Sequence, residues 1–142
     1  MRELPRQLSE EELEELFNGP STLVSLLAET EDPLGRAEEV ATGLPDEDKV
    51  EALATHPRIG EPSPEQQGHD PTVLTELAYL NQVYEEKFGF RFVVFVAGRP
   101  HGDILPVLRE RLARSREEEL ETGIGELVAI AQDRWQDQWR HR

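Results

Sequence analysis

The sequence predicts an all-α protein: a compact helical bundle in a single domain over residues 1–142, interrupted by two irregular segments. Apolar residues recur at helical spacing in successive groups, and each group is bounded by proline, glycine or a capping residue. At 142 residues the chain is long enough for one domain with one sizeable core. The interruptions are a proline-rich loop at residues 56–66 and an aromatic, β-branched stretch at residues 88–96.

Local signals place the first three helices. Ser9 and Glu12 form a capping-box pattern before an apolar stripe that ends at a Gly-Pro pair, residues 19–20. A second apolar group at residues 23–27 predicts the next helix. An Asp-Pro pair at residues 32–33 indicates an N-cap and a first-turn proline for the third helix.

The fourth helix is predicted to present a histidine at its C-terminus. Asp46 is expected to cap this helix, which must end near Thr55 because a following proline disfavours helical backbone. His56 then follows the helix C-terminus, where the macrodipole favours the protonated imidazole, and the acidic composition acts in the same direction. A histidine that carries a proton near neutral pH is suited to general acid catalysis.

The second half of the chain is expected to hold three more helices. One opens at the Asp-Pro pair of residues 70–71, and the next is capped by Asp103 with Pro106 in its first turn. Another capping box, at residues 115–118, starts a long final helix. Between them, residues 88–96 predict a buried extended segment without a neighbouring strand, so its backbone must pair with a loop, another subunit or a ligand.

The composition excludes several classes of protein. A formal net charge of −15 repels nucleic acids and anionic membranes. No apolar run approaches the roughly 20 residues that cross a bilayer, and no secretory signal is evident. The absence of cysteine excludes a disulfide framework, a thiolate nucleophile and a zinc finger, and it fits a cytoplasmic location.

The candidate catalytic side chains are concentrated in the proline-rich loop. His56, Glu65 and Gln66 bring a proton-transfer group, a carboxylate and an amide within a few residues of each other. Prolines stiffen this run, and a rigid polar loop between amphipathic helices is a common place for function. One interpretation is a metal-dependent hydrolase with His56, Glu65 and His69 as ligands. Another is a non-catalytic helical adaptor whose acidic face contacts a basic partner.

Four motifs in order and with compatible spacing resemble the OHCU decarboxylase family, which acts on 2-oxo-4-hydroxy-4-carboxy-5-ureidoimidazoline in the ureide pathway from urate. The resemblance covers roughly residues 46–135. The motifs are His-Pro-Arg-Ile-Gly at 56–60, Ser-x-Glu-Gln-x-Gly at 63–68, Leu-Asn-x-x-Tyr-x-x-Lys-Phe-Gly-Phe-x-Phe-Val at 80–93, and Ile-Ala-x-x-Arg at 130–134.

The resemblance implies a decarboxylation that needs no cofactor and gives (S)-allantoin, and it suggests a homodimer. It implies that His56 donates the proton, that Glu65 steers the carboxylate or ureido group, and that Gln66 binds the ring or ureido amide. Arg134 matches the substrate-binding arginine, and Arg116 is a weaker candidate. The other residues implied to line the pocket or to offer backbone groups are Pro57, Pro62, Ser63, Pro64, Phe92, Val93, Val94, Phe95 and Val96.

The chain departs from the family pattern in two places. The loop between the histidine and glutamate motifs is short, and Arg91 replaces a proline. Because Arg91 alternates with buried aromatic positions, we expect it to point to solvent. Asn81 on an apolar helix face is expected to be a structural hydrogen-bonding residue, whereas His69 and His101 are expected to be exposed loop residues.

Overall fold

The computed structural model describes residues 7–59 and 71–140, except for the side chains of 138–140. It is all-α in these residues, which confirms the predicted fold class. The helices are α1 (Glu10–Phe17), α2 (Thr22–Ala28), α3 (Pro33–Thr42), α4 (Asp46–Ala54), α5 (Pro71–Phe88), α6 (His101–Leu112) and α7 (Arg116–Arg140).

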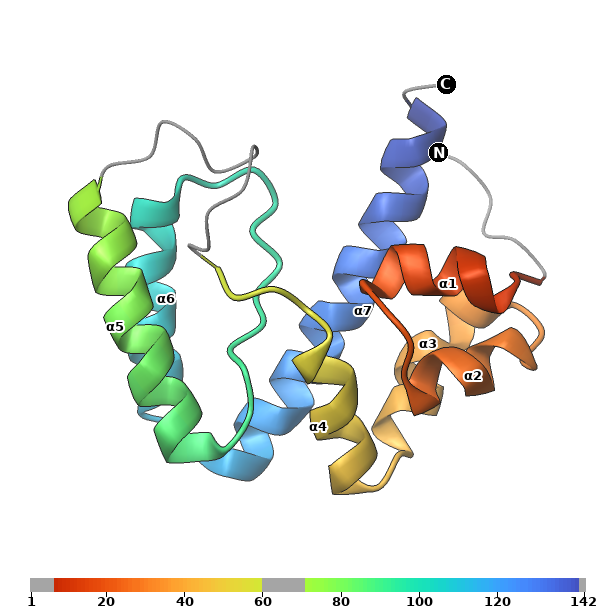
Figure 1. The fold of residues 1–142 in the computed structure, drawn as a ribbon, viewed down its shortest axis with the longest axis horizontal. Helices are drawn as coiled ribbons and strands as arrows, with labels where there is room; N and C mark the ends of the chain where they lie inside the picture. The colour runs from red at the N-terminus through yellow and green to blue at the C-terminus, as the bar shows by residue number, and fades with distance from the viewer. Residues whose placement is uncertain (1–6, 60–70, 141–142) are drawn as a thin grey trace.

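The long helix α7 is the axis of the fold. Helices α1, α3 and α4 pack against it, and α2 packs on α1, α3 and α4 (Figure 1). Helices α5 and α6 lie side by side on the other side of the molecule and run in the same direction, and the segment between them returns to the start of α6 on the side that faces α4 and α7 (Figure 1). This segment therefore lies between the two groups of helices.

The predicted N-terminal caps of the helices are confirmed at some positions and wrong at others. The capping boxes at Ser9 and Ser115 form as predicted. Asp46 and Asp103, however, are not caps: α4 and α6 begin directly after Pro45 and Pro100, whose extended backbone occupies the N-cap position. The two aspartates lie instead in the first turn, where a carboxylate still interacts favourably with the helix dipole.

One of the predictions made from two prolines is only partly right, and the other is wrong. Asp32 occupies the N-cap position of α3 ahead of Pro33, but it has left-handed backbone and its side chain accepts no capping hydrogen bond. Pro106 was predicted in the first turn of its helix, yet it lies inside α6, because this helix starts at His101.

The core where the two groups of helices meet is aromatic. The fully buried ring of Tyr84 on α5 contacts Phe88, Phe90 and Phe92, with ring centroids 4.6, 5.9 and 5.3 Å away. Such tilted and edge-on pairs add to the hydrophobic gain from burial. They hold the start of the extended segment against α5, and the three phenylalanines are buried, as predicted.

Residues 91–96 are extended but belong to no strand. Side chains bind their backbone instead: the carbonyl of Val93 accepts from Nη1 of Arg111 at 2.7 Å. The amide of Phe95 donates to Glu126, and Arg99 donates to the carbonyls of Phe95 and Val96. The predicted unpaired strand is thus satisfied in part by side chains of α6, α7 and its own following turn.

No helix in the described parts of the chain is both long and apolar enough to span a bilayer.

Candidate active site

A cavity of about 690 Å³ opens where the end of α4, the extended segment, the start of α6 and the C-terminal half of α7 meet. The residues after α4 form one side and residues 94–100 form another. The described lining residues are His56, Pro57, Arg58, Ile59, Phe92, Val94, Phe95, Val96, Ala97, Gly98, Arg99, Pro100, His101, Ile130, Asp133 and Arg134.

His56 enters this cavity as a half-buried imidazole just past the C-terminus of α4. Burial lowers the pKa of His56 from 6.5 to about 4, and the positive charges of Arg134 and Arg91 act in the same direction. The sequence-based expectation of a protonated histidine is therefore wrong for the free protein. The overall charge is acidic, but the groups that face this imidazole are cationic.

Arg91 explains why the helix dipole does not protonate His56. Its Nη1 donates to the carbonyls of Ala54 and His56, at 2.7 and 2.9 Å. The guanidinium therefore neutralises the partial negative charge that the end of α4 would offer to the imidazole. The prediction that Arg91 points to solvent is therefore wrong. Its side chain joins the extended segment to the end of α4.

The lowered pKa of His56 predicts a pH dependence of stability. The unfolded imidazole binds its proton near pH 6.5 and the folded one only near pH 4, so the folded state loses stability as the pH falls through this range. Relative to His56→Asn, we expect the parent protein to lose about 1 kcal/mol more between pH 7 and pH 5, allowing for partial exposure. Urea unfolding at both pH values measures this difference, and parallel losses in the two proteins would contradict it.

The polar lining of the cavity is mostly cationic. Three arginines and one aspartate, Asp133, face it among the described residues. Arg58 is held by a bidentate ion pair with Glu85 on α5, with nitrogen–oxygen distances of 2.7 and 3.0 Å. Arg134 reaches in from α7 and donates from Nη1 to the carbonyl of Leu16, at 2.9 Å. A cavity of this charge favours an anionic ligand.

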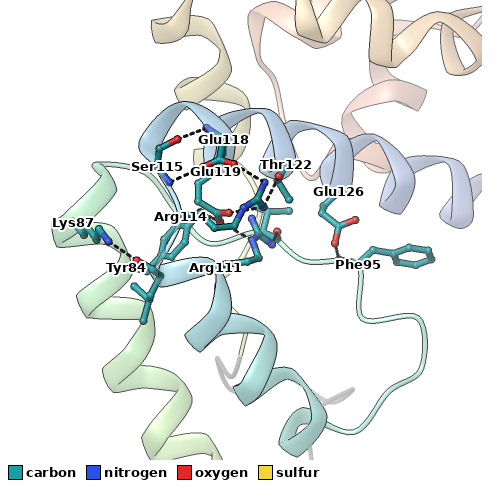
Figure 2. Close-up of polar contacts among 12 residues, drawn as sticks. Tyr84, Lys87, Phe95, Arg111, Arg114, Ser115, Glu118, Glu119, Thr122 and Glu126 are labelled. Carbon is teal, nitrogen blue, oxygen red and sulfur yellow. Dashed lines mark hydrogen bonds and ion pairs between the residues drawn. The ribbon is translucent and has the colours of Figure 1, made fainter.

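Behind the extended segment lies a buried ionic cluster (Figure 2). The fully buried carboxylate of Glu119 accepts hydrogen bonds from Nε of Arg111 at 2.6 Å, Nη1 of Arg114 at 2.9 Å and the hydroxyl of Tyr84 at 2.7 Å. Burial raises the pKa of Tyr84 well above its usual value, so its hydroxyl keeps its proton and donates. Arg111 also lies 4.5 Å from the ring centroid of Phe92. The cluster therefore fixes the cavity wall from behind.

Comparison with known proteins decides the family. The model of the OHCU decarboxylase family matches residues 2–136, nearly the whole chain.

The chain belongs to the OHCU decarboxylase family.

Individual relatives agree with this assignment. The chain is 36% identical over 102 residues to "Uric acid degradation bifunctional protein TTL" of Arabidopsis thaliana, covering 60% of this chain and 32% of that protein. It is 33% identical over 95 residues to a 2-oxo-4-hydroxy-4-carboxy-5-ureidoimidazoline decarboxylase of Halalkalicoccus jeotgali, covering 58% and 54%. The matched parts thus span from a third to about half of these curated relatives.

Solved structures give the same fold. A crystal structure of OHCU decarboxylase in the presence of (S)-allantoin superposes with a TM-score of 0.75 at 27% identity, covering 87% of this chain and 94% of the other. A crystal structure of (S)-allantoin synthase has a TM-score of 0.70 at 18% identity, covering 88% and 47%, and shows the shared fold.

The structure brings together the described residues that the family pattern singled out, with one exception. The predicted residues that line the cavity are His56, Pro57, Phe92, Val94, Phe95, Val96 and Arg134. Val93 is buried and is not among the lining residues, and its carbonyl is bound to Arg111. Pro62, Ser63, Pro64, Glu65 and Gln66 lie outside the described residues, so their roles stay predictions.

Other predictions have a clear outcome. Arg116 lies away from the cavity, where it donates to the carbonyl of Phe88 and pairs with Asp46. Asn81 is structural as predicted, since its amide donates to the carbonyls of Ile59 and Leu77. His101 is not an exposed loop residue: it is buried at the start of α6 and lines the cavity. No nearby sequence feature signals this position.

Metal ligation is not apparent in the residues that the structure describes. Among them, no three histidine, aspartate or glutamate side chains are close enough to hold a metal ion. The proposed ligands Glu65 and His69 lie outside these residues.

Proposed function

We propose that this protein decarboxylates OHCU to (S)-allantoin in urate degradation, without a cofactor. The observation that carries the proposal is the cavity, in which His56 and Arg134 line the same space in a chain of the OHCU decarboxylase family. The family match favours this activity over the hydrolase and adaptor interpretations.

The chemistry of the substrate fits the cavity. OHCU carries a carboxylate on a tertiary carbon beside an imine-type carbon. When the bond to the carboxylate breaks, carbon dioxide leaves and the electron pair stays on the ring, which can accept it. A proton must then reach that carbon from one face to give a single enantiomer. The enzyme therefore has to hold an anion, exclude water and place one proton donor.

Charge in the cavity links substrate binding to the protonation of His56. In the free protein, the positive charge of Arg134 contributes to the low pKa of the imidazole. A substrate carboxylate that pairs with Arg134 offsets this charge and adds a negative neighbour, both of which raise the pKa of His56. The imidazole can then take up a proton and deliver it to the carbanion, whose charge favours imidazolium until transfer. Glu65 and Gln66 retain the roles that the resemblance implies.

The activity is tested with freshly generated OHCU, whose spontaneous decay gives racemic allantoin. We expect the purified protein to accelerate the reaction and to produce a circular dichroism signal of one sign, because the proton is delivered to one face. Product that forms no faster than in buffer, or without optical activity, would contradict the proposed function.

Arg134→Ala is expected to raise KM about 10-fold or more and to lower kcat much less, because Arg134 binds the anionic substrate in the ground state as well as in the transition state. Steady-state kinetics measure this. Arg134 also bonds to the carbonyl of Leu16, so Arg134→Lys serves as the partner variant that retains the charge. An unchanged KM in Arg134→Ala would exclude Arg134 as the substrate arginine.

We further propose that residues 1–142 form a single domain, in keeping with the chain length, and that the protein acts in the cytoplasm, which the lack of cysteine fits. We also propose that it forms a homodimer, as the family resemblance implies. The apolar residues near the C-terminal tryptophans offer the interface. Sedimentation equilibrium of the purified chain tests the oligomeric state.

A further inference from the structure

We infer that Asn18 is a positioning residue that holds His56 in the tautomer with its proton on Nε2. The inference deepens the proposed function, since it concerns the proton donor of the same site. Asn18 lies at the C-terminus of α1, in the first third of the chain, where no functional motif was recognised.

The contact that carries the inference joins two side chains 38 residues apart. Nδ2 of Asn18 lies 3.1 Å from Nδ1 of His56. The amide nitrogen of asparagine can only donate, so Nδ1 accepts, and a neutral ring then has its hydrogen on Nε2. His56 lines the cavity and Asn18 does not. Nε2 is thus the ring nitrogen left for the substrate. When substrate binding protonates the ring, the added proton goes to Nδ1, and the Asn18 amide can turn so that its Oδ1 accepts from it.

Asn18 is held in place by the helix that it terminates. Its backbone is left-handed, with φ 69° and ψ 23°, and its N–H donates to the carbonyl of Glu14. Asparagine tolerates this conformation better than most residues with a Cβ. The backbone from which the amide projects is therefore fixed by the end of α1 and does not depend on His56.

The end of α1 also holds two other parts of the site. The carbonyl of Leu16 accepts from Arg134, and the carbonyl of Phe17 accepts from Oγ1 of Thr55 at 3.0 Å. One turn of α1 thus contacts Arg134, the residue before His56, and the His56 ring itself. This arrangement fixes the position of the imidazole relative to the guanidinium, which efficient proton delivery requires.

Two substitutions separate the amide from the backbone that carries it. Asn18→Gly retains the left-handed turn without steric cost and removes the amide. Asn18→Asp retains the shape but offers only acceptors, so it should draw the proton to Nδ1 and leave Nε2 bare. Thr55→Val is the matched control, because it removes another hydrogen bond between the ends of α1 and α4 without touching the imidazole.

The other charged groups around His56 stay the same in these variants. Arg91 from the extended segment and Arg134 from α7 act on the imidazole. Arg58, Arg99, His101 and Asp133 complete the charged or titratable groups that line the cavity among the described residues. A carboxylate at position 18 therefore adds one negative charge to a mostly positive surrounding, and it should raise the pKa of His56.

The direct experiment is ¹⁵N NMR of the histidine side chains in substrate-free protein at neutral pH, with His56 assigned by its absence in His56→Asn. We expect shifts of the Nε2–H tautomer in the parent protein and in Thr55→Val, and of the Nδ1–H tautomer in Asn18→Asp, with a higher pKa on titration. A parent protein with its proton on Nδ1, or unchanged shifts in Asn18→Asp, would overturn the inference.

Kinetics supply the functional readout. Asn18→Gly should lower kcat about 10-fold with little change in KM or in the unfolding midpoint, because the donor is misplaced while the anion site is intact. An unchanged kcat would overturn the positioning role. If the parent protein proves inactive toward OHCU, the proposed function fails, but the NMR result still decides the tautomer.

Discussion

His56→Asn should lower kcat by about 10²–10⁴, the usual contribution of a positioned general acid. The variant removes the transferable proton but retains much of the local structure. The side-chain oxygen of asparagine can take the place of Nδ1 and still accept from the amide of Asn18, which now lies 3.1 Å from that nitrogen. Stopped-flow decay of OHCU and the optical activity of the product measure the effect.

The same variant distinguishes catalysis from folding. Because the folded imidazole is neutral at pH 7, its replacement removes no charge from the cavity at this pH. We therefore expect an unfolding midpoint at pH 7 close to that of the parent and a similar KM, since Arg134 is unchanged. A kcat within a few-fold of the parent value would remove His56 from the chemistry and leave the proton donor to another group.

Glu119→Gln should destabilise the protein by roughly 3–5 kcal/mol, the cost of breaking a buried ion pair from one side. Glu119 is fully buried and compensates two guanidinium groups, of which that of Arg111 is also buried. Without the carboxylate, Arg111 keeps its charge in a site that water does not reach. Urea unfolding at pH 7 measures the loss.

Glu117→Gln is the matched control for this prediction. Glu117 lies two residues earlier in the first turn of α7 but is exposed, so its replacement should cost about 0.5 kcal/mol or less. The loss in Glu119→Gln should also reach the active site, since Arg111 binds the carbonyl of Val93 and stacks on Phe92. A stability within 1 kcal/mol of the control would mean that the cluster contributes little.

Sequence patterns were sufficient where a structure depends on residues a few positions apart. The capping boxes at Ser9 and Ser115 close within one helical turn, and both form. Asp46 and Asp103 show the limit of such patterns. Aspartate is a strong N-cap, but the preceding prolines already hold the extended backbone that the N-cap position needs, and the helices begin one and three residues earlier than a capping aspartate would allow.

Contacts between distant segments could not be predicted in this way. Arg91 finds its acceptors on residues 35 and 37 positions earlier, and Asn18 meets His56 across 38 positions. The pKa of His56 depends on these neighbours, so sequence reasoning singled out a residue that lines the cavity but predicted the wrong protonation state for it. Membership in the family placed Arg134 near His56, whereas the end of α1 that supports both is visible only in the fold.

The extended segment between α5 and α6 has a consequence for how the cavity can change. In a sheet, moving one strand disturbs all the backbone hydrogen bonds that it forms with its neighbouring strands. Val93, Phe95 and Val96 are instead each tethered by side chains, namely those of Arg111, Glu126 and Arg99. The tethers from Glu126 and Arg99 can each be lengthened, shortened or exchanged by a single substitution, whereas Arg111 also belongs to the buried cluster with Glu119 and is not free to change alone. The width of this wall is thus open to stepwise adaptation to new substrates while the helices around it stay as they are.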